Sequence, residues 1–280
     1  MIDGSVGLLV LGAAVLHASW NAVVKRARDS LVMQAFIIAV SAVIALPFGL
    51  ALPPPAPETW LYILAGVMIH GLYFGLLVKA YEIGDFSHVY PVARGTGPLI
   101  VAVAATVFLG ETLSLRQYAG VALVSLGIIS LAFTARDGGG RQAMKVALAV
   151  GALIASYTVI DGLGSRSGDE PFAFIAWLLV LSALPIGVYA VWRRGPRRAI
   201  EAARRQIVPG LLAGAVCGFG YAIVLWAYSR GTLAAIAALR ETSVIFAALI
   251  GAALFGERFG ARRILAAALV AAGAILLNLG

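Results

Sequence analysis

The chain has 280 residues, of which 61% are hydrophobic and only 12% are charged, and its mean hydropathy is +0.96. Soluble domains carry about 25% charged residues, so these values exclude an ordinary water-soluble fold. The net charge of +8 would suit nucleic acid, but the placement of the basic residues, described below, argues against a nucleic-acid partner.

Windows of about 19 residues predict ten apolar segments, each near the roughly 20 residues that a helix needs to cross the hydrocarbon layer. The connections between them are short, which leaves no room for a soluble domain. We therefore predict an all-α polytopic membrane protein with ten transmembrane helices. In chain order the segments are 5–24, 32–52, 59–80, 87–109, 115–134, 143–163, 171–192, 206–229, 234–255 and 261–279.

Several functions find no support in the sequence. No basic stretch precedes the first segment, so we expect it to be retained and not cleaved as a signal peptide. The single cysteine, Cys217, cannot supply a disulfide or a metal cluster within one chain. The chain also lacks a His-Glu-x-x-His motif and a Walker loop, so we expect no enzyme activity, no metal, no cofactor and no ATP-driven transport.

The basic residues gather in the odd-numbered connections, whereas the even-numbered connections hold only Arg116, Arg166 and Arg230. Cytoplasmic loops carry an excess of Lys and Arg, so we predict cytoplasmic odd-numbered connections and periplasmic termini in a bacterial inner membrane. Attraction of these residues to anionic membrane lipid is a secondary effect. The odd-numbered set comprises Lys25, Arg26, Arg28, Arg136, Arg141, Lys145, Arg193, Arg194, Arg197, Arg198, Arg204, Arg205, Arg258, Arg262 and Arg263.

One stretch of the chain is repeated. The segment that runs from Arg94 to Glu111 returns from Arg240 to Glu257, with Arg, Thr, Gly and Glu at the same spacing. An arginine inside an apolar segment is costly, so its occurrence in both copies indicates a specific role. The first segments of the two copies also correspond, since His17–Asn21 aligns with 154–158.

The repeat divides the chain into two halves, which we place at 1–134 and 143–280 with a linker at 135–142. Each half contains five segments. Because five is odd, the second half enters the membrane from the opposite face. We therefore predict two inverted-topology five-helix repeats around a central cavity.

The ten segments in two sets of five carry a family resemblance over nearly the whole chain. Ser19-Trp20-Asn21 in the first segment and the Gly-Glu pairs that close segments four and nine resemble the drug/metabolite transporter superfamily, in its EamA-type branch. The resemblance implies a ten-helix carrier whose cavity is lined by helices one, three, four, six, eight and nine. It also implies that the chain moves small metabolites: members of this branch mostly export them, amino acids included, and some take compounds up.

Polar residues in segments one and six are candidates for lining the cavity. His17, Trp20 and Asn21 share one helix face, and they either face a wet cavity or bond neighbouring helices. The matching face of segment six carries Tyr157, followed one turn later by Asp161. We place Asp161 near the outer end of its helix, where exposure at the membrane interface is an equal alternative.

Segments three and eight carry aromatic stripes. His70, Tyr73 and Phe74 follow one another at helical spacing, and the counterpart stripe contains Tyr221. Such rings suit a solute with an apolar side chain, although rings at helix ends, as in Tyr81 and Tyr228, also sort to membrane interfaces. His70 is either a hydrogen-bonding residue or a proton carrier. Tyr90 and Trp226 complete the candidate cavity residues.

The strongest candidates are Arg94 and Arg240, each roughly 10 Å deep from one face. Arginine binds a carboxylate or phosphate through two parallel hydrogen bonds, although a side chain at this depth can also extend to the membrane surface. Glu241 points about 100° away from Arg240 around a regular helix, so it need not be the partner of Arg240. It serves either an asymmetric substrate or a neighbouring helix.

Two further groups are interpreted as parts of the fold. Glu111 and Glu257 close segments four and nine, where we expect them to bond loop amides and not substrate. Glycines at four-residue spacing allow close helix packing; they are Gly71, Gly75, Gly210, Gly214 and Gly218.

Together these features predict a secondary transporter that exports small-molecule substrates, with amino acids (aromatic ones included) as the leading class, by alternating access. Uptake of organophosphonate-like anions is an alternative, and a membrane enzyme or sensor subunit is an alternative of another class. We expect a monomer and leave a dimer open.

Overall fold

The computed structural model describes residues 3–83, 86–132, 141–168, 170–255 and 260–279. Within these ranges all regular secondary structure is helical. The helices are α1 Gly4–Arg26, α2 Ser30–Ala51, α3 Pro57–Ile83, α4 Phe86–Leu109, α5 Leu115–Ser130, α6 Arg141–Arg166, α7 Pro171–Arg194, α8 Pro196–Arg204, α9 Ile207–Tyr228, α10 Leu233–Arg240, α11 Ser243–Phe255 and α12 Ala261–Leu279.

The helices follow the predicted segments. Eight stretches of the described chain are long and apolar enough to cross a membrane, and two shorter apolar helices, in α5 and α12, complete the set. The prediction of an all-α polytopic membrane protein is thus confirmed. The predicted linker at 135–142 lies mostly outside the described residues, and α6 begins at Arg141.

The ninth segment is not the continuous helix that the sequence predicts. It is divided into α10 and α11 by a tight turn in which the amides of Glu241 and Thr242 donate to the carbonyls three residues earlier. The Thr242 hydroxyl also donates to Leu239 O at 2.7 Å. The end of α10 and the start of α11 therefore meet at Glu241 and Thr242.

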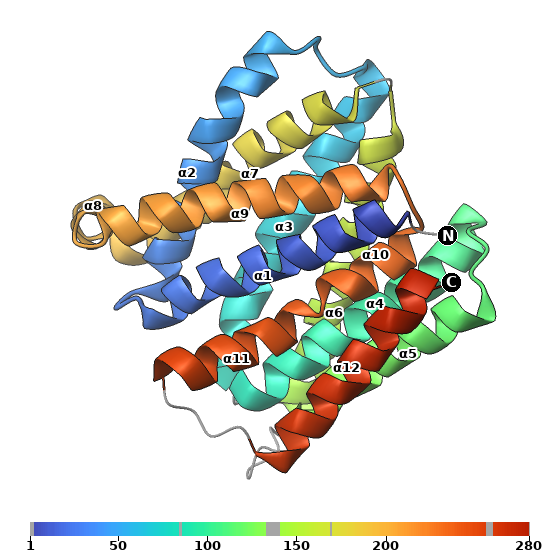
Figure 1. Cartoon of the computed structure of the whole chain (residues 1–280). Helices are drawn as coiled ribbons and strands as arrows, with labels where there is room; N and C mark the ends of the chain where they lie inside the picture. Colours follow the sequence, from blue (N-terminus) through green and yellow to red (C-terminus); the bar gives the residue numbers. More distant parts are fainter. Residues whose placement is uncertain (1–2, 84–85, 133–140, 169, 256–259, 280) are drawn as a thin grey trace.

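The basic connection after segment seven contains a short helix, α8, which the sequence did not predict. Gly195, with φ of 77°, ends α7, and Pro196 occupies the first position of α8. Glycine tolerates this φ, and proline at the first helical position loses no intrahelical hydrogen bond. In Figure 1, α8 lies at the opposite end of the molecule from the two termini.

Corresponding helices of the two halves make corresponding contacts. α5 packs on α12 and α2 packs on α7, so each of these pairs joins counterparts; α3 packs on α6 as α1 packs on α9, and α4 packs on α6 as α1 packs on α11. Figure 1 shows α1 and α9 lying side by side across the middle of the molecule. This exchange of partners is the arrangement that an inverted repeat produces.

Glycines permit the closest of these contacts, as predicted for segment eight. A Cβ on Gly214 would lie 2.5 Å from Val40 Cβ, and one on Gly210 would lie 2.4 Å from the Phe36 ring. In segment three, Gly71 faces Pro185 in the same way, whereas a Cβ on Gly75 would meet open space. Gly75 is therefore no part of a packing contact.

The odd-numbered and even-numbered connections lie at opposite ends of the bundle. At one end, Arg194 Nε lies 2.7 Å from Asp29 Oδ2, which joins the first and seventh connections. At the other end, both Glu111 carboxylate oxygens accept from the Leu233 amide, and Glu111 also pairs with Arg166 Nη1 at 2.9 Å. The expectation that Glu111 bonds a loop amide is confirmed; Glu257 lies outside the described residues.

Candidate functional site

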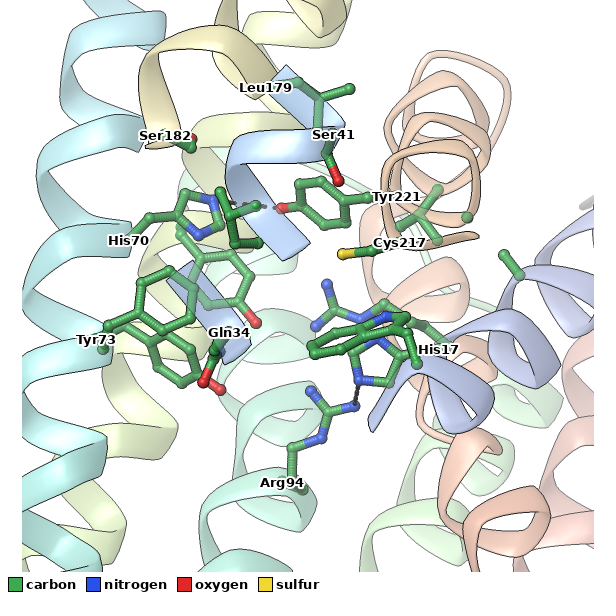
Figure 2. A pocket seen from close by; sticks show the side chains of 18 residues that line it. His17, Gln34, Ser41, His70, Tyr73, Arg94, Leu179, Ser182, Cys217 and Tyr221 are labelled. Carbon is green, nitrogen blue, oxygen red and sulfur yellow. Dashed lines mark hydrogen bonds between the residues drawn. The ribbon is translucent and has the colours of Figure 1, made fainter. Parts of the chain in front are cut away.

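A pocket of about 110 Å³ lies where the two halves meet. Figure 2 shows polar and aromatic side chains surrounding it, with Arg94 and His17 on one side and His70 and Tyr221 on the other. Most of the predicted cavity residues line it: His17, Trp20, His70, Tyr73, Phe74, Arg94, Tyr157, Tyr221 and Arg240.

Five predicted residues do not line this pocket. Asn21 turns its amide to the His17 carbonyl of its own helix at 2.8 Å. Trp226 packs against the apolar core and lies 5.6 Å from the Arg230 guanidinium, and Tyr90 lies beneath the Arg94 guanidinium at 5.7 Å. Asp161 and Glu241 are fully buried and in contact with residues that line the pocket.

Two helices line the pocket that the family resemblance did not include. α2 contributes Gln34, Ile38 and Ser41, and α7 contributes Leu179 and Ser182. α2 and α7 are the second helices of their halves and contact each other. Because the two halves are repeats, we expect α2 and α7 to be alike in whether they line the pocket. Gln34, a polar residue in an otherwise apolar segment, was the sequence signal for them. Cys217 of α9 also lines the pocket.

The two buried arginines share one carboxylate. Arg94 Nε lies 2.8 Å from Glu241 Oε2, and Arg240 Nη2 lies 3.2 Å from Glu241 Oε1. Arg94 Nε and Glu241 Oε2 form an ion pair without a hydrogen bond, because the Nε–H group does not point at the oxygen. Glu241 thus pairs with a neighbouring helix, which was one of the two alternatives for it, and it is also a partner of Arg240.

This arginine cluster, made of Arg94, Arg240 and Glu241, carries surplus positive charge. The arginine side chains are 4% exposed and Glu241 is not exposed at all. Within the described chain the cluster contains two guanidinium groups and one carboxylate, so one positive charge is left for a ligand. Buried charges need partners, and an anion entering the pocket would supply one.

His17 is part of the same cluster. Arg94 Nη2 lies 3.1 Å from His17 Nε2 and 3.4 Å from the Ser243 hydroxyl. A guanidinium can only donate, so His17 Nε2 accepts this hydrogen bond and the ring is neutral. The first half thus contributes Arg94 and His17 to a cluster whose carboxylate comes from the second half.

A second polar cluster occupies the opposite wall of the pocket. His70 Nε2 lies 2.9 Å from Asp161 Oδ2, and the Tyr221 hydroxyl donates to the same oxygen at 2.5 Å. Of the two alternatives for Asp161, interface exposure is wrong: its side chain is fully buried, with His70 of α3 and Tyr221 of α9 on its carboxylate. The interface alternative for Tyr228 is also wrong, since its side chain is fully buried.

Tyr157 links the two clusters. Its ring stacks on the His70 ring, with 4.4 Å between centroids, and the Arg240 guanidinium lies over the same ring at 5.6 Å. Tyr73 contacts Tyr157 edge-on at 5.6 Å. An aromatic surface therefore runs between a cationic end and a His-Asp end of one small pocket.

Comparison with known proteins agrees with this architecture. A model of the EamA-like transporter family matches the chain twice, at residues 5–133 and 142–279. An uncharacterized protein, y4nH, of Sinorhizobium fredii is 36% identical over 94 residues, which are 32% of this chain and 80% of that protein.

Two further matches are informative. A protein described as an uncharacterized transporter in the cobO 3' region, from a Sinorhizobium species, is 29% identical over 94 residues, which are 33% of this chain and 66% of that protein. A solved structure described only as a crystal structure of a protein matches with a TM-score of 0.75 over 98% of both chains, at 18% identity. At that identity the likeness concerns the fold alone.

Proposed function

Because the chain belongs to the EamA-like transporter family, we propose that it is a secondary transporter that exports small organic metabolites, chiefly amino acids, across the bacterial inner membrane. Membership of the family identifies the chain as a membrane transporter of the drug/metabolite type. The observation that carries the proposal is the surplus positive charge where Arg94 and Arg240 meet Glu241 beside the pocket.

The arginine cluster supports an anionic group in the substrate. The carboxylate of an amino acid would take guanidinium N–H groups of Arg94 or Arg240 that Glu241 leaves available, through charge-assisted hydrogen bonds. The bound carboxylate would neutralise the surplus charge of the cluster. An empty site would retain that charge, so occupancy would bias the relative positions of the two halves.

The aromatic surface supports an apolar side chain in the substrate. Trp20, Tyr73, Phe74 and Tyr157 line the pocket, and their rings offer large apolar faces with few rotatable bonds. A cavity of about 110 Å³ favours a small solute. These features together suit an amino acid, aromatic ones included.

We further propose that the odd-numbered connections face the cytoplasm and that the termini face the periplasm, because the basic residues gather at the odd-numbered end. The two halves enclose the pocket within one chain, which supports a monomer as the working unit. Alternating access would then expose the pocket to each side in turn.

Counterflow in liposomes tests the proposal. Purified protein should exchange labelled phenylalanine for unlabelled phenylalanine, and Arg94→Ala should lower the apparent affinity about 10- to 100-fold, the worth of a hydrogen bond to a charged group. Arg198→Ala, at an exposed position of α8, is the control and should change nothing. Exchange of an alkylphosphonate in place of amino acids would favour the uptake alternative. A protein that moves neither solute would leave a non-transport role ahead.

A further inference from the structure

We propose that His70 and Asp161 form a proton-binding site that couples solute movement to H⁺ movement. The inference rests on the proposed transport function and adds to it the ion that drives transport. It is carried by the geometry of the His-Asp end of the pocket, where a histidine lines the cavity and a fully buried carboxylate stands behind it.

Asp161 is held as an acceptor inside the membrane-spanning bundle. Its Oδ2 accepts from His70 and Tyr221, while its Oδ1 is buried without a hydrogen-bond partner. A buried carboxylate without full compensation is costly in a membrane. A positive charge on His70, at 2.9 Å, would provide that compensation.

The carboxylate itself is out of the solute's reach. Oδ1 points at α3, where a Cβ on Gly66 would lie only 2.8 Å from it, and Asp161 does not line the pocket. His70 does line the pocket, so the imidazole is the group that water or solute can meet. A proton can join or leave its Nδ1 while Nε2–H continues to donate to Asp161.

The pocket's other histidine is in the opposite situation. His17 Nε2 accepts from the Arg94 guanidinium, which can only donate, so a second proton on His17 would remove its hydrogen bond and place two cations together. His70 instead faces a carboxylate. The pocket therefore holds two different histidines. His17 is fixed in the neutral form by Arg94, whereas His70 keeps its hydrogen bond to Asp161 in both the neutral and the charged form.

The groups that face His70 permit this change of charge. α6 presents Asp161 and Tyr157, and α9 presents Tyr221, while α7 meets this part of α3 through apolar Leu178 and Pro185. The guanidinium of Arg240 lies over the same Tyr157 ring.

The remaining charged and titratable groups lie further along the pocket. Arg94 of α4 lies on the opposite side from His70 (Figure 2), and Tyr73 belongs to α3 itself and contacts Tyr157. Asp161 is thus the anion next to His70 in the described chain. When the pocket lacks an anionic solute, repulsion from Arg94 and Arg240 disfavours the charged form of His70.

Comparison of the two halves indicates that the His70–Asp161 pair is not needed for helix packing. Counterparts of His70, Asp161 and Tyr221 in the alignment of the halves are Cys217, Val24 and Phe74. The bundle therefore closes at the mirrored place without an ion pair. A feature present on one side only makes a single proton site for each central pocket.

These positions couple the proton to the solute through charge. With His70 neutral, the Asp161 carboxylate balances the surplus charge of the arginine cluster; with His70 protonated, that surplus remains and an anionic group binds more tightly. The proton and the anionic group therefore bind together, and the proton leaves from Nδ1 when the anionic group leaves. No bond other than that of the proton is made or broken.

Solid-state NMR of the full-length protein in lipid bilayers tests the site without any solute. The chain has three histidines, so ¹⁵N-histidine labelling gives one pair of ring signals for each, assigned with His17→Gln and His88→Gln variants. We expect the charged form of the His70 ring to appear as the pH is lowered across the range in which the protein stays folded, and the His17 ring to stay neutral. Loss of the charged form in Asp161→Asn is the second expected result.

A His70 ring that stays neutral throughout this range in the wild-type protein would overturn the proposal, as would an unchanged titration in Asp161→Asn. The wild-type measurement stands by itself if Asp161→Asn does not fold. Because no solute is added, the result is independent of whether amino acids are the substrate.

Flux measurements test the coupling. In liposomes with an entrapped pH-sensitive dye, addition of phenylalanine should move H⁺, and the protons moved per phenylalanine should vanish in Asp161→Asn but not in Ser156→Ala, at an exposed position of α6. Phenylalanine exchange that a pH gradient cannot drive would end the coupling proposal and leave transport intact. Absence of any exchange would instead end the transport proposal, and the NMR titration would still decide whether His70 binds the proton.

Discussion

Replacing Glu241 with glutamine should destabilise the protein through charge alone. The substitution keeps the shape of the side chain but removes the carboxylate that lies 2.8 Å from Arg94 Nε and 3.2 Å from Arg240 Nη2. At an effective dielectric constant near 20 the two attractions amount to about 6 and about 5 kcal/mol. Desolvation offsets part of this, and removing one partner of a buried pair typically costs about 3–5 kcal/mol.

The assay is thermal unfolding of the purified protein in detergent. We expect Glu241→Gln to lower the midpoint by roughly 10 °C, given the loss of about 3–5 kcal/mol and the usual size dependence. Glu201→Gln, at an exposed position of α8, is the matched control and should leave the midpoint unchanged. Added acetate should stabilise Glu241→Gln more than the wild type, because the variant has more uncompensated charge.

A double variant separates charge from packing. Arg94→Gln with Glu241→Gln restores the net charge of the arginine cluster, so it should recover part of the stability that Glu241→Gln loses. If Glu241→Gln unfolds at the wild-type temperature, or if the losses of the two single variants simply add, the carboxylate does not hold the guanidinium groups together and the reasoning fails.

Three further predictions concern the frame around the pocket. Glu111→Gln should cost about 1–2 kcal/mol in thermal unfolding, because it weakens a charged cap of α10, and an unchanged midpoint would show that the cap is unimportant. Gly214→Ala should destabilise by about 1–3 kcal/mol through overpacking, whereas Gly75→Ala, in open space, should be neutral or slightly stabilising; equal effects would contradict the packing account. In a cysteine-free background, Arg28→Cys should react with a membrane-impermeant thiol reagent from the cytoplasm and Glu170→Cys from the periplasm, and labelling from one side only would refute the topology.

Hydropathy and the repeat predicted the spans and their pairing in two halves, because a membrane demands long apolar helices whatever their neighbours are. They could not predict the break between α10 and α11. Arg240, Glu241 and Thr242 are all compatible with a helix. The Thr242 hydroxyl bonds Leu239 O within the turn itself, but Glu241 pairs with Arg94 across the bundle. Arg94 is far away in sequence.

The contact between His70 and Asp161 could not be predicted either, because it also joins residues that are far apart in sequence. His70 and Asp161 are 91 positions apart, and a one-residue change in the register of α3 against α6 would separate them. The aligned halves gave no signal, since Val24 occupies the place of Asp161. By contrast Arg94 and Arg240 were found because each repeats the other.

The cap at Glu111 makes the two halves depend on each other for folding. Its carboxylate belongs to the first half, but the amide of Leu233 and the guanidinium of Arg166 belong to the second. A fragment that contained only the second half would leave the Leu233 amide without its acceptor and Arg166 without its carboxylate, although Arg166 would keep its bonds to the Tyr228 and Gly231 carbonyls. Two fragments made separately would have to associate before either became stable, so joining them in one polypeptide guarantees equal supply and immediate encounter during synthesis.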